Sequence, residues 1–193
     1  MRKPHEDLRA AVLAEAGRLL EVEGARALSA RRLAAAAGCS VGTLYNIFEH
    51  LDGVVRAVNR ETMKRLAAAL AKADPGEGAG RAARLEALGQ GYLAFGLANP
   101  ARWELLFRYR LDTPAEALPA ELATLLALLR SVAGPGPSDE ALIALWAAVH
   151  GVVELAVARR LPNATEGAEG RMIALVIEAG IRGLAAEGFG RDP

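Results

Sequence analysis

A break between two short helices is the sequence feature that most constrains the fold. Within residues 28–48, small and apolar residues recur at three- and four-residue spacing, which is typical of a helix: Leu33, Ala34 and Ala37. Ser29 is a good N-cap for this helix, and Gly38 follows its last apolar residue, where a left-handed backbone ends a helix at little steric cost. Ser40 is placed to cap a second helix. The segment therefore predicts two helices joined by a tight turn, the arrangement that places a helix in the major groove of DNA.

The second helix has one apolar face and one face free to contact a partner. Its inward residues are Leu44, Ile47 and Phe48, and the residues nearer its exposed face are Val41, Gly42, Thr43, Tyr45 and Asn46. In a DNA-binding protein, these exposed residues form the reading surface. The alternative is a plain pair of helices in a helical protein, because alanine-rich helices joined by glycine are common there.

The rest of the chain also predicts helices, so we expect an all-α fold with about nine of them. The expected ranges are 7–22, 52–73, 81–98, a short helix from 101, 114–132, 138–160 (capped by Ser138) and 165–187 (capped by Thr165). Asp74–Gly80 is rich in glycine and separates the two parts of the chain. The expected organisation is a helix-turn-helix domain over 1–50, a connecting helix over 51–73 and a C-terminal helical domain over 74–193.

Charge and composition agree with this organisation. Formal net charge is zero over 193 residues, yet residues 1–73 carry +4 and the remainder −4, so the basic part contains the helix pair. A single cysteine excludes an internal disulfide. We find no apolar stretch long enough for a membrane span and no apolar signal region, which predicts a cytoplasmic protein without a membrane partner.

The N-terminal part resembles the DNA-binding domain of TetR-family transcriptional regulators. The residues that carry the resemblance are Leu28-Ser29, Ala37-Gly38-Cys39-Ser40, Gly42-Thr43-Leu44-Tyr45 and Phe48. Together with the exposed residues of the second helix, it implies DNA contacts from Ser29, Arg31, Ser40, Val41, Gly42, Thr43, Tyr45 and Asn46. One departure is Leu51, because these regulators often have a phosphate-binding lysine at this place.

The C-terminal part is similar to one group of TetR-like domains. Trp146-Ala-Ala-Val-His150-Gly151 matches its Trp…His-Gly signature, and Asn99-Pro100 precedes a short aromatic helix as in that group. The candidate pocket residues are Tyr92, Phe95, Trp103, Phe107, Trp146 and His150, which favour an apolar or aromatic effector. Trp146 and His150 share a helix face, so His150 is either a core histidine with a hydrogen-bond partner or a ligand contact.

The resemblance implies a homodimeric repressor that releases operator DNA when a small-molecule effector binds. We expect the last two long helices to form the dimer surface, through residues such as Val153 and Leu175, unless their apolar stripes face the core of the same chain. No catalytic motif is apparent, and one cysteine with three dispersed histidines does not predict a metal site, so we expect no enzyme activity and no cofactor. The alternative function is a helical interaction or scaffold module that does not bind DNA.

Overall fold

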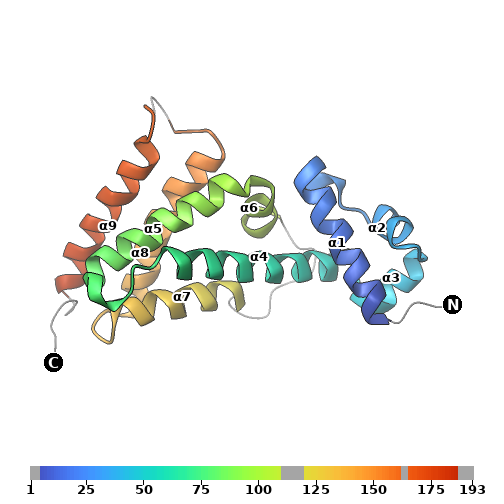
Figure 1. The fold of residues 1–193 in the computed structure, drawn as a ribbon, viewed down its shortest axis with the longest axis horizontal. Helices are drawn as coiled ribbons and strands as arrows, with labels where there is room; N and C mark the ends of the chain where they lie inside the picture. The colour runs from blue at the N-terminus through green and yellow to red at the C-terminus, as the bar shows by residue number, and fades with distance from the viewer. Residues whose placement is uncertain (1–4, 110–119, 162–164, 187–193) are drawn as a thin grey trace. The chain divides into compact units, whose positions relative to one another are not determined.

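The computed structural model describes residues 5–109, 120–161 and 165–186, which contain nine α-helices and no strand (Figure 1). This confirms the all-α prediction. In chain order the elements are α1 (His5–Glu23), the 3₁₀ turn η1 (Ala25–Ala27), α2 (Ala30–Ala37), α3 (Val41–Phe48), α4 (Leu51–Ala73), η2 (Glu77–Ala79), α5 (Gly80–Ala98), α6 (Pro100–Phe107), α7 (Ala120–Ala133), α8 (Asp139–Val157) and α9 (Ala168–Ala186).

The chain divides into two compact units. The first contains α1, α2, α3, α4 up to Lys64, and α6. The second contains the rest of α4 together with α5, α7, α8 and α9. Two features therefore do not follow the order of the chain: α4 contributes to both units, and α6 packs with helices that precede it by about half of the sequence.

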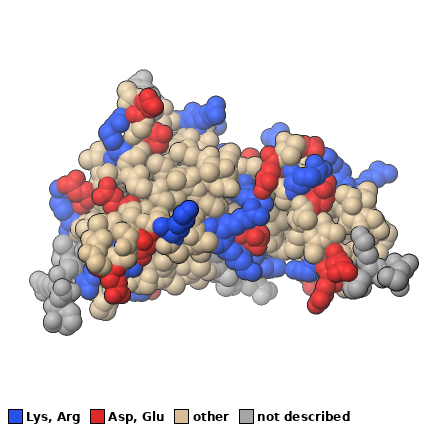
Figure 2. Space-filling model, in the orientation of Figure 1, with Lys and Arg blue, Asp and Glu red and all other residues tan. Residues whose placement is uncertain are grey.

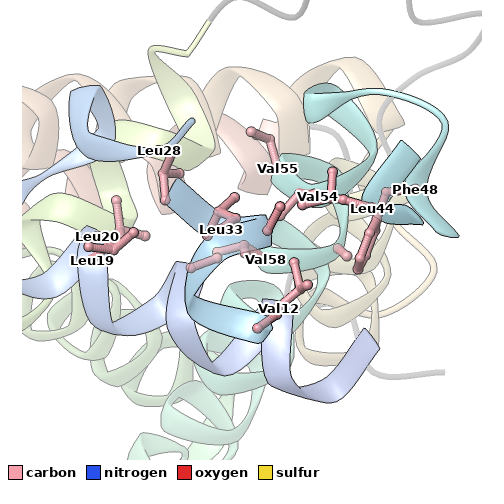
Figure 3. Close-up of a cluster of buried hydrophobic side chains, with 14 of the residues drawn as sticks. Val12, Leu19, Leu20, Leu28, Leu33, Leu44, Phe48, Val54, Val55 and Val58 are labelled. Carbon is pink, nitrogen blue, oxygen red and sulfur yellow. The ribbon is translucent and has the colours of Figure 1, made fainter. Parts of the chain in front are cut away.

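The first unit has its own apolar core, drawn in Figure 3. Its larger members come from α1, α2, α3 and α4, with Leu28 from the end of η1 and one residue from α6: Val12, Leu19, Leu20, Leu28, Leu33, Leu44, Phe48, Val54, Val55, Val58 and Leu105. Each side chain of this size contributes about 1.5–3 kcal/mol when it is fully buried. The helix pair is thus held as a rigid body by α1, α4 and α6.

The second unit packs α5 against α7, α8 and α9. Two glycines allow its helices to approach closely. A Cβ at Gly89 would lie 2.9 Å from Cγ2 of Ile173, and one at Gly180 would overlap Leu145. Val153 is fully buried inside the chain, whereas Leu175 is 64% exposed. The two residues that we predicted at a dimer surface therefore differ, and Val153 belongs to the core.

Helix α8 differs from the expectation that no stretch is long and apolar enough for a membrane span. By length and composition alone, α8 is long and apolar enough to cross a membrane, with 19 residues and a mean hydropathy of 1.7. One side of α8, however, is buried in the second unit through Leu142, Leu145, Val149, Val152 and Val153. This side packs against α5, α7 and α9, whereas Ile143 and Leu155 on the other side of α8 are exposed.

Most helix boundaries lie within two residues of those predicted, and the exceptions have local causes. The predicted start of α7 at Pro114 lies outside the described residues. Helix α8 ends at Val157 rather than Arg160, because Arg159 adopts a φ of 53°. Thr165 does not cap α9. The helix begins only at Ala168, and the Thr165 hydroxyl accepts a hydrogen bond from Arg171 instead.

Candidate nucleic-acid interface and internal cavity

The turn between α2 and α3 is built as the sequence predicts. The Ser29 hydroxyl accepts a hydrogen bond from the Arg32 backbone N–H (3.4 Å), and Gly38 ends α2 in the left-handed region with φ 72°. The Ser40 hydroxyl accepts a hydrogen bond from the Thr43 backbone N–H (3.0 Å) and contacts the Thr43 hydroxyl (2.9 Å). Because both caps are satisfied within the turn, α3 has a fixed direction relative to α2.

One face of α3 is buried and the other is open. Leu44 and Phe48 are buried, and Ile47 is half-buried. Of the residues predicted on the reading surface, Gly42, Tyr45 and Asn46 are exposed, while Val41 and Thr43 are half-buried. Helix α3 therefore presents an accessible surface of uncharged side chains.

The arginines of α2 differ in what they can offer to a partner. Arg32 donates two hydrogen bonds to the Glu23 carboxylate (2.9 and 2.7 Å), and these bonds lower the pKa of Glu23. Arg31 is exposed, and the described residues give its guanidinium no ion pair. Figure 2 shows Lys and Arg interspersed with Asp and Glu on the visible face of the molecule. Arg31 is therefore a cation of α2 that is accessible to a partner.

The junction between α3 and α4 is strained, which the sequence analysis missed. Glu49 ends α3 with φ 65° and ψ −57°, a rare conformation for a residue with a side chain. A Cβ at Gly53 would overlap the carbonyl oxygen of Phe48, so only glycine fits in this first turn of α4. Leu51, where a lysine is common in the resembled family, is half-buried beside this junction. The two helices thus meet in a tight contact with little freedom.

The second unit contains a small, partly open cavity of about 40 Å³ that no polar atom faces. Its walls come from α4, α5, α7, α8 and α9: Leu70, Leu85, Leu88, Gly89, Tyr92, Leu125, Leu128, Leu129, Leu145, Trp146, Val149 and Ile177. The leucines of α7 were not among our candidates, because leucine at helical spacing predicts a core as readily as a binding wall.

The polar atoms of the aromatic wall are bonded to one another. Trp146 Nε1–H donates to the Tyr92 hydroxyl (3.3 Å), which lies 3.0 Å from His150 Nδ1. The His150 ring stacks on Trp146 with centroids 5.1 Å apart. Burial lowers the pKa of His150, which favours a neutral ring whose Nδ1 accepts the Tyr92 hydrogen, and burial raises the pKa of Tyr92. His150 is thus a partly buried histidine with a hydrogen-bond partner, the hydroxyl of Tyr92.

The structure brings together only some of the candidate pocket residues. Tyr92 and Trp146 line the cavity, and His150 lies directly behind them. Phe95 is buried in α5 but does not line it. Trp103 and Phe107 pack on each other in the first unit, with ring centroids 4.6 Å apart, and neither lines this cavity. The reason is that α6 packs onto the helices of the first unit.

Two family models match successive parts of the chain. Residues 12–58 match "Bacterial regulatory proteins, tetR family", and residues 85–179 match "Tetracyclin repressor-like, C-terminal domain". The chain belongs to the TetR family of transcriptional regulators. It is a DNA-binding transcriptional regulator with a helix-turn-helix domain, and it is not an enzyme, because TetR-family regulators act by binding DNA. No curated protein matches the chain.

Solved structures agree with the TetR fold over nearly the whole chain. A protein of unknown function from Rhodococcus sp. RHA1 is 26% identical, with a TM-score of 0.72 and coverage of 92% of this chain and 95% of that one. A TetR-like transcriptional regulator from the same organism is 19% identical (TM-score 0.59, coverage 94% and 100%). A TetR-family transcription regulator from Marinobacter aquaeolei VT8 is 18% identical (TM-score 0.61, coverage 93% and 98%).

Within the described residues, His, Cys, Asp and Glu form no group that could hold a metal ion.

Proposed function

We propose that this regulator is a cytoplasmic homodimeric repressor that releases its operator when a small apolar or aromatic effector enters the cavity. The observation that carries the proposal is the position of Leu70. It lines the cavity, and it lies on α4, the helix that begins at the tight junction with α3. An effector that moves Leu70 therefore acts on a helix joined directly to the reading surface.

The DNA contacts in this proposal come from the start of α2 and the exposed side of α3: Ser29, Arg31, Ser40, Val41, Gly42, Thr43, Tyr45 and Asn46. Tyr45 is 40% exposed, and we assign its hydroxyl to a phosphate, which positions the protein without specifying sequence. Arg31 has the reach and the free donors to contact the edge of a guanine.

The size of the cavity supports effector-driven movement. A cavity of roughly 150 Å³ is needed to hold benzene, whereas the volume here is about 40 Å³. An aromatic or longer aliphatic molecule therefore requires its walls to move apart. Packed helices respond to added volume by shifting as whole elements, so the walls respond through α4, α5, α7, α8 or α9. Effector and DNA then weaken each other's binding by the same factor, typically about 5- to 150-fold.

An apolar surface of the second unit supports the dimer. On α8, Ile143, Ala147, Gly151 and Leu155 are exposed and follow each other at four-residue spacing. On α9, which packs against α8, the exposed small and apolar residues are Met172, Leu175, Ala179 and Gly183. Two such faces packed against each other give a four-helix bundle.

Filling the cavity tests the effector part of the proposal. Leu129→Trp adds a large side chain to the α7 wall, and Leu97→Trp adds the same side chain at a position that is 44% exposed and does not line the cavity. Apolar compounds, beginning with indole and 1-octanol, are screened by thermal shift, and hits are tested for release of DNA flanking the gene. We expect Leu129→Trp to lose both stabilisation and release, and Leu97→Trp to keep both.

Two outcomes contradict the proposal. Compounds that stabilise the wild-type protein but leave its DNA affinity unchanged would reject effector-controlled release. Equal responses from Leu129→Trp and wild type would place the effector site elsewhere.

A further inference from the structure

The accessible face of α3 carries no positive charge. Its exposed positions are Gly42, Tyr45 and Asn46, which lie on one face of the helix. The half-buried hydroxyl of Thr43 is bonded to Ser40 and belongs to the cap of the helix. Guanine is recognised most often by bidentate Arg or Lys, and α3 contains neither. The chemistry of this face therefore favours A·T over G·C base pairs.

Asn46 is the residue of this face that can identify a base. Its side chain is exposed, and the described part of the chain gives its amide no hydrogen-bond partner. The amide presents one donor and one acceptor in a fixed plane, which matches N6–H and N7 of adenine in the major groove. Asn46 is one helical turn beyond Gly42, so the two residues lie on the same side of α3.

Gly42 is not required by the fold of the chain itself. It lacks a positive φ, and a Cβ there would meet only Oγ of Ser40, at 3.7 Å, an ordinary contact. Alanine would suit the helix better, because glycine loses more backbone freedom when it folds. A glycine here leaves the backbone of α3 open to close approach by a partner surface.

We propose that α3 reads an A·T-containing half-site, in which Asn46 specifies adenine and Gly42 admits the groove wall beside it. The proposal rests on the proposed function, because it assumes that α3 enters the major groove. Asn46 is then the specificity-determining residue of the helix, and Gly42 is a positioning residue that sets its depth in the groove.

Selection of binding sites from random duplex DNA tests Asn46 without knowledge of the operator. The full-length wild-type chain should enrich adenine at one position of each half-site. Asn46→Ala and the isosteric Asn46→Asp, which lacks the amide donor, should each lose about tenfold or more of the preference for adenine there, with the other positions unchanged. An unchanged adenine preference in both variants overturns the assignment.

Gly42→Ala separates docking from folding. We expect weaker binding to every selected sequence, together with a melting temperature equal to or above that of the wild type, because alanine favours the helix. A purely structural glycine would lower the melting temperature instead. Unchanged affinity, or a lower melting temperature, overturns the role given to Gly42.

The selection also distinguishes this inference from the proposed function. Wild-type protein that enriches G·C pairs beneath α3 contradicts only the inference, since DNA binding remains. Wild-type protein that enriches no sequence contradicts both.

Discussion

His150 is held in an unusual state for a histidine, because its ring is stacked on Trp146 and its Nδ1 faces the Tyr92 hydroxyl. Burial lowers its pKa, while the negative charge of Glu154 on the same helix opposes this effect. Protonation would place a hydrogen on Nδ1, where the Tyr92 hydrogen now points. The Trp146–Tyr92–His150 arrangement thus depends on a neutral ring, and a neutral ring keeps the cavity wall apolar.

The lowered pKa of His150 predicts how stability depends on pH. In the unfolded chain the ring takes up a proton as the pH falls through about 6.5, whereas the folded chain resists this until lower pH. The contribution of the neutral His150 ring to the free energy of unfolding is therefore complete above about pH 6.5. It is lost as the pH falls toward the pKa of His150 in the folded chain. Urea unfolding at about pH 7.5 and about pH 5.5 should show a smaller acid-induced loss for His150→Gln than for wild type.

The exposed His50 supplies the control for this measurement. His50→Gln should keep the wild-type difference in stability between the two pH values. Equal pH dependence in His150→Gln and wild type would contradict the neutral, buried state of His150.

At the scale of elements, α6 is attached to the first unit through a buried arginine. The Arg102 side chain is 5% exposed, and it donates to Oε1 of Glu21 on α1 through Nη2 (2.7 Å) and Nε (3.0 Å). Its Nη1 donates to the hydroxyl of Thr62 on α4 (3.3 Å). Gly17 leaves room for the guanidinium, which a Cβ there would approach to 3.2 Å. One side chain therefore connects α6 to two other helices.

Removal of the Glu21 carboxylate should destabilise this attachment. Glu21→Ala leaves the buried guanidinium without its anionic acceptor, and we expect a loss of about 1–3 kcal/mol in the free energy of unfolding. Glu15→Ala is the matched control, because Glu15 lies on the same helix and pairs with the exposed Arg18. An exposed pair contributes only about 0–1 kcal/mol. Equal losses in the two variants, measured by urea unfolding, would show that Arg102 does not need Glu21.

The sequence predicted where the helices begin and end better than it predicted which helices pack together. Gly38 and Ser40 determine the helix ends around the turn by local geometry, so the helix pair could be located from sequence alone. Trp103 could not be placed, because helical periodicity indicates that a face is buried but not which element covers it. The strained turn at Glu49 and Gly53 was missed for another reason: a positive φ is rare at glutamate, so the residue types there do not indicate it.

At the scale of the whole molecule, α4 is the covalent link between reading surface and cavity. It begins at the junction with Phe48 and reaches the cavity wall at Leu70. Gly91 of α5 holds this end closely, since a Cβ there would lie 2.8 Å from Cβ of Ala73. A ligand can shift the equilibrium between two arrangements only by its difference in affinity for them. In the proposed function, the effector must therefore favour one arrangement of α4, and the close contacts at both ends of this helix limit how much of its movement is absorbed.

The proposed dimer gives the last prediction, for which Leu175 is the most informative position. Its side chain is 64% exposed in the single chain, so Leu175→Arg should fold normally while placing an unpaired charge in the interface. Such a charge should weaken the dimer by about 3–5 kcal/mol. Val22→Arg, at a 69% exposed position of α1, is the control with the same change of charge. Light scattering should find monomers for Leu175→Arg and dimers for Val22→Arg, with the melting temperature checked for both.

DNA affinity should fall with Leu175→Arg as well, because two helix-turn-helix domains must bind the two half-sites of an operator together. A stable dimer of Leu175→Arg would place the interface on another surface.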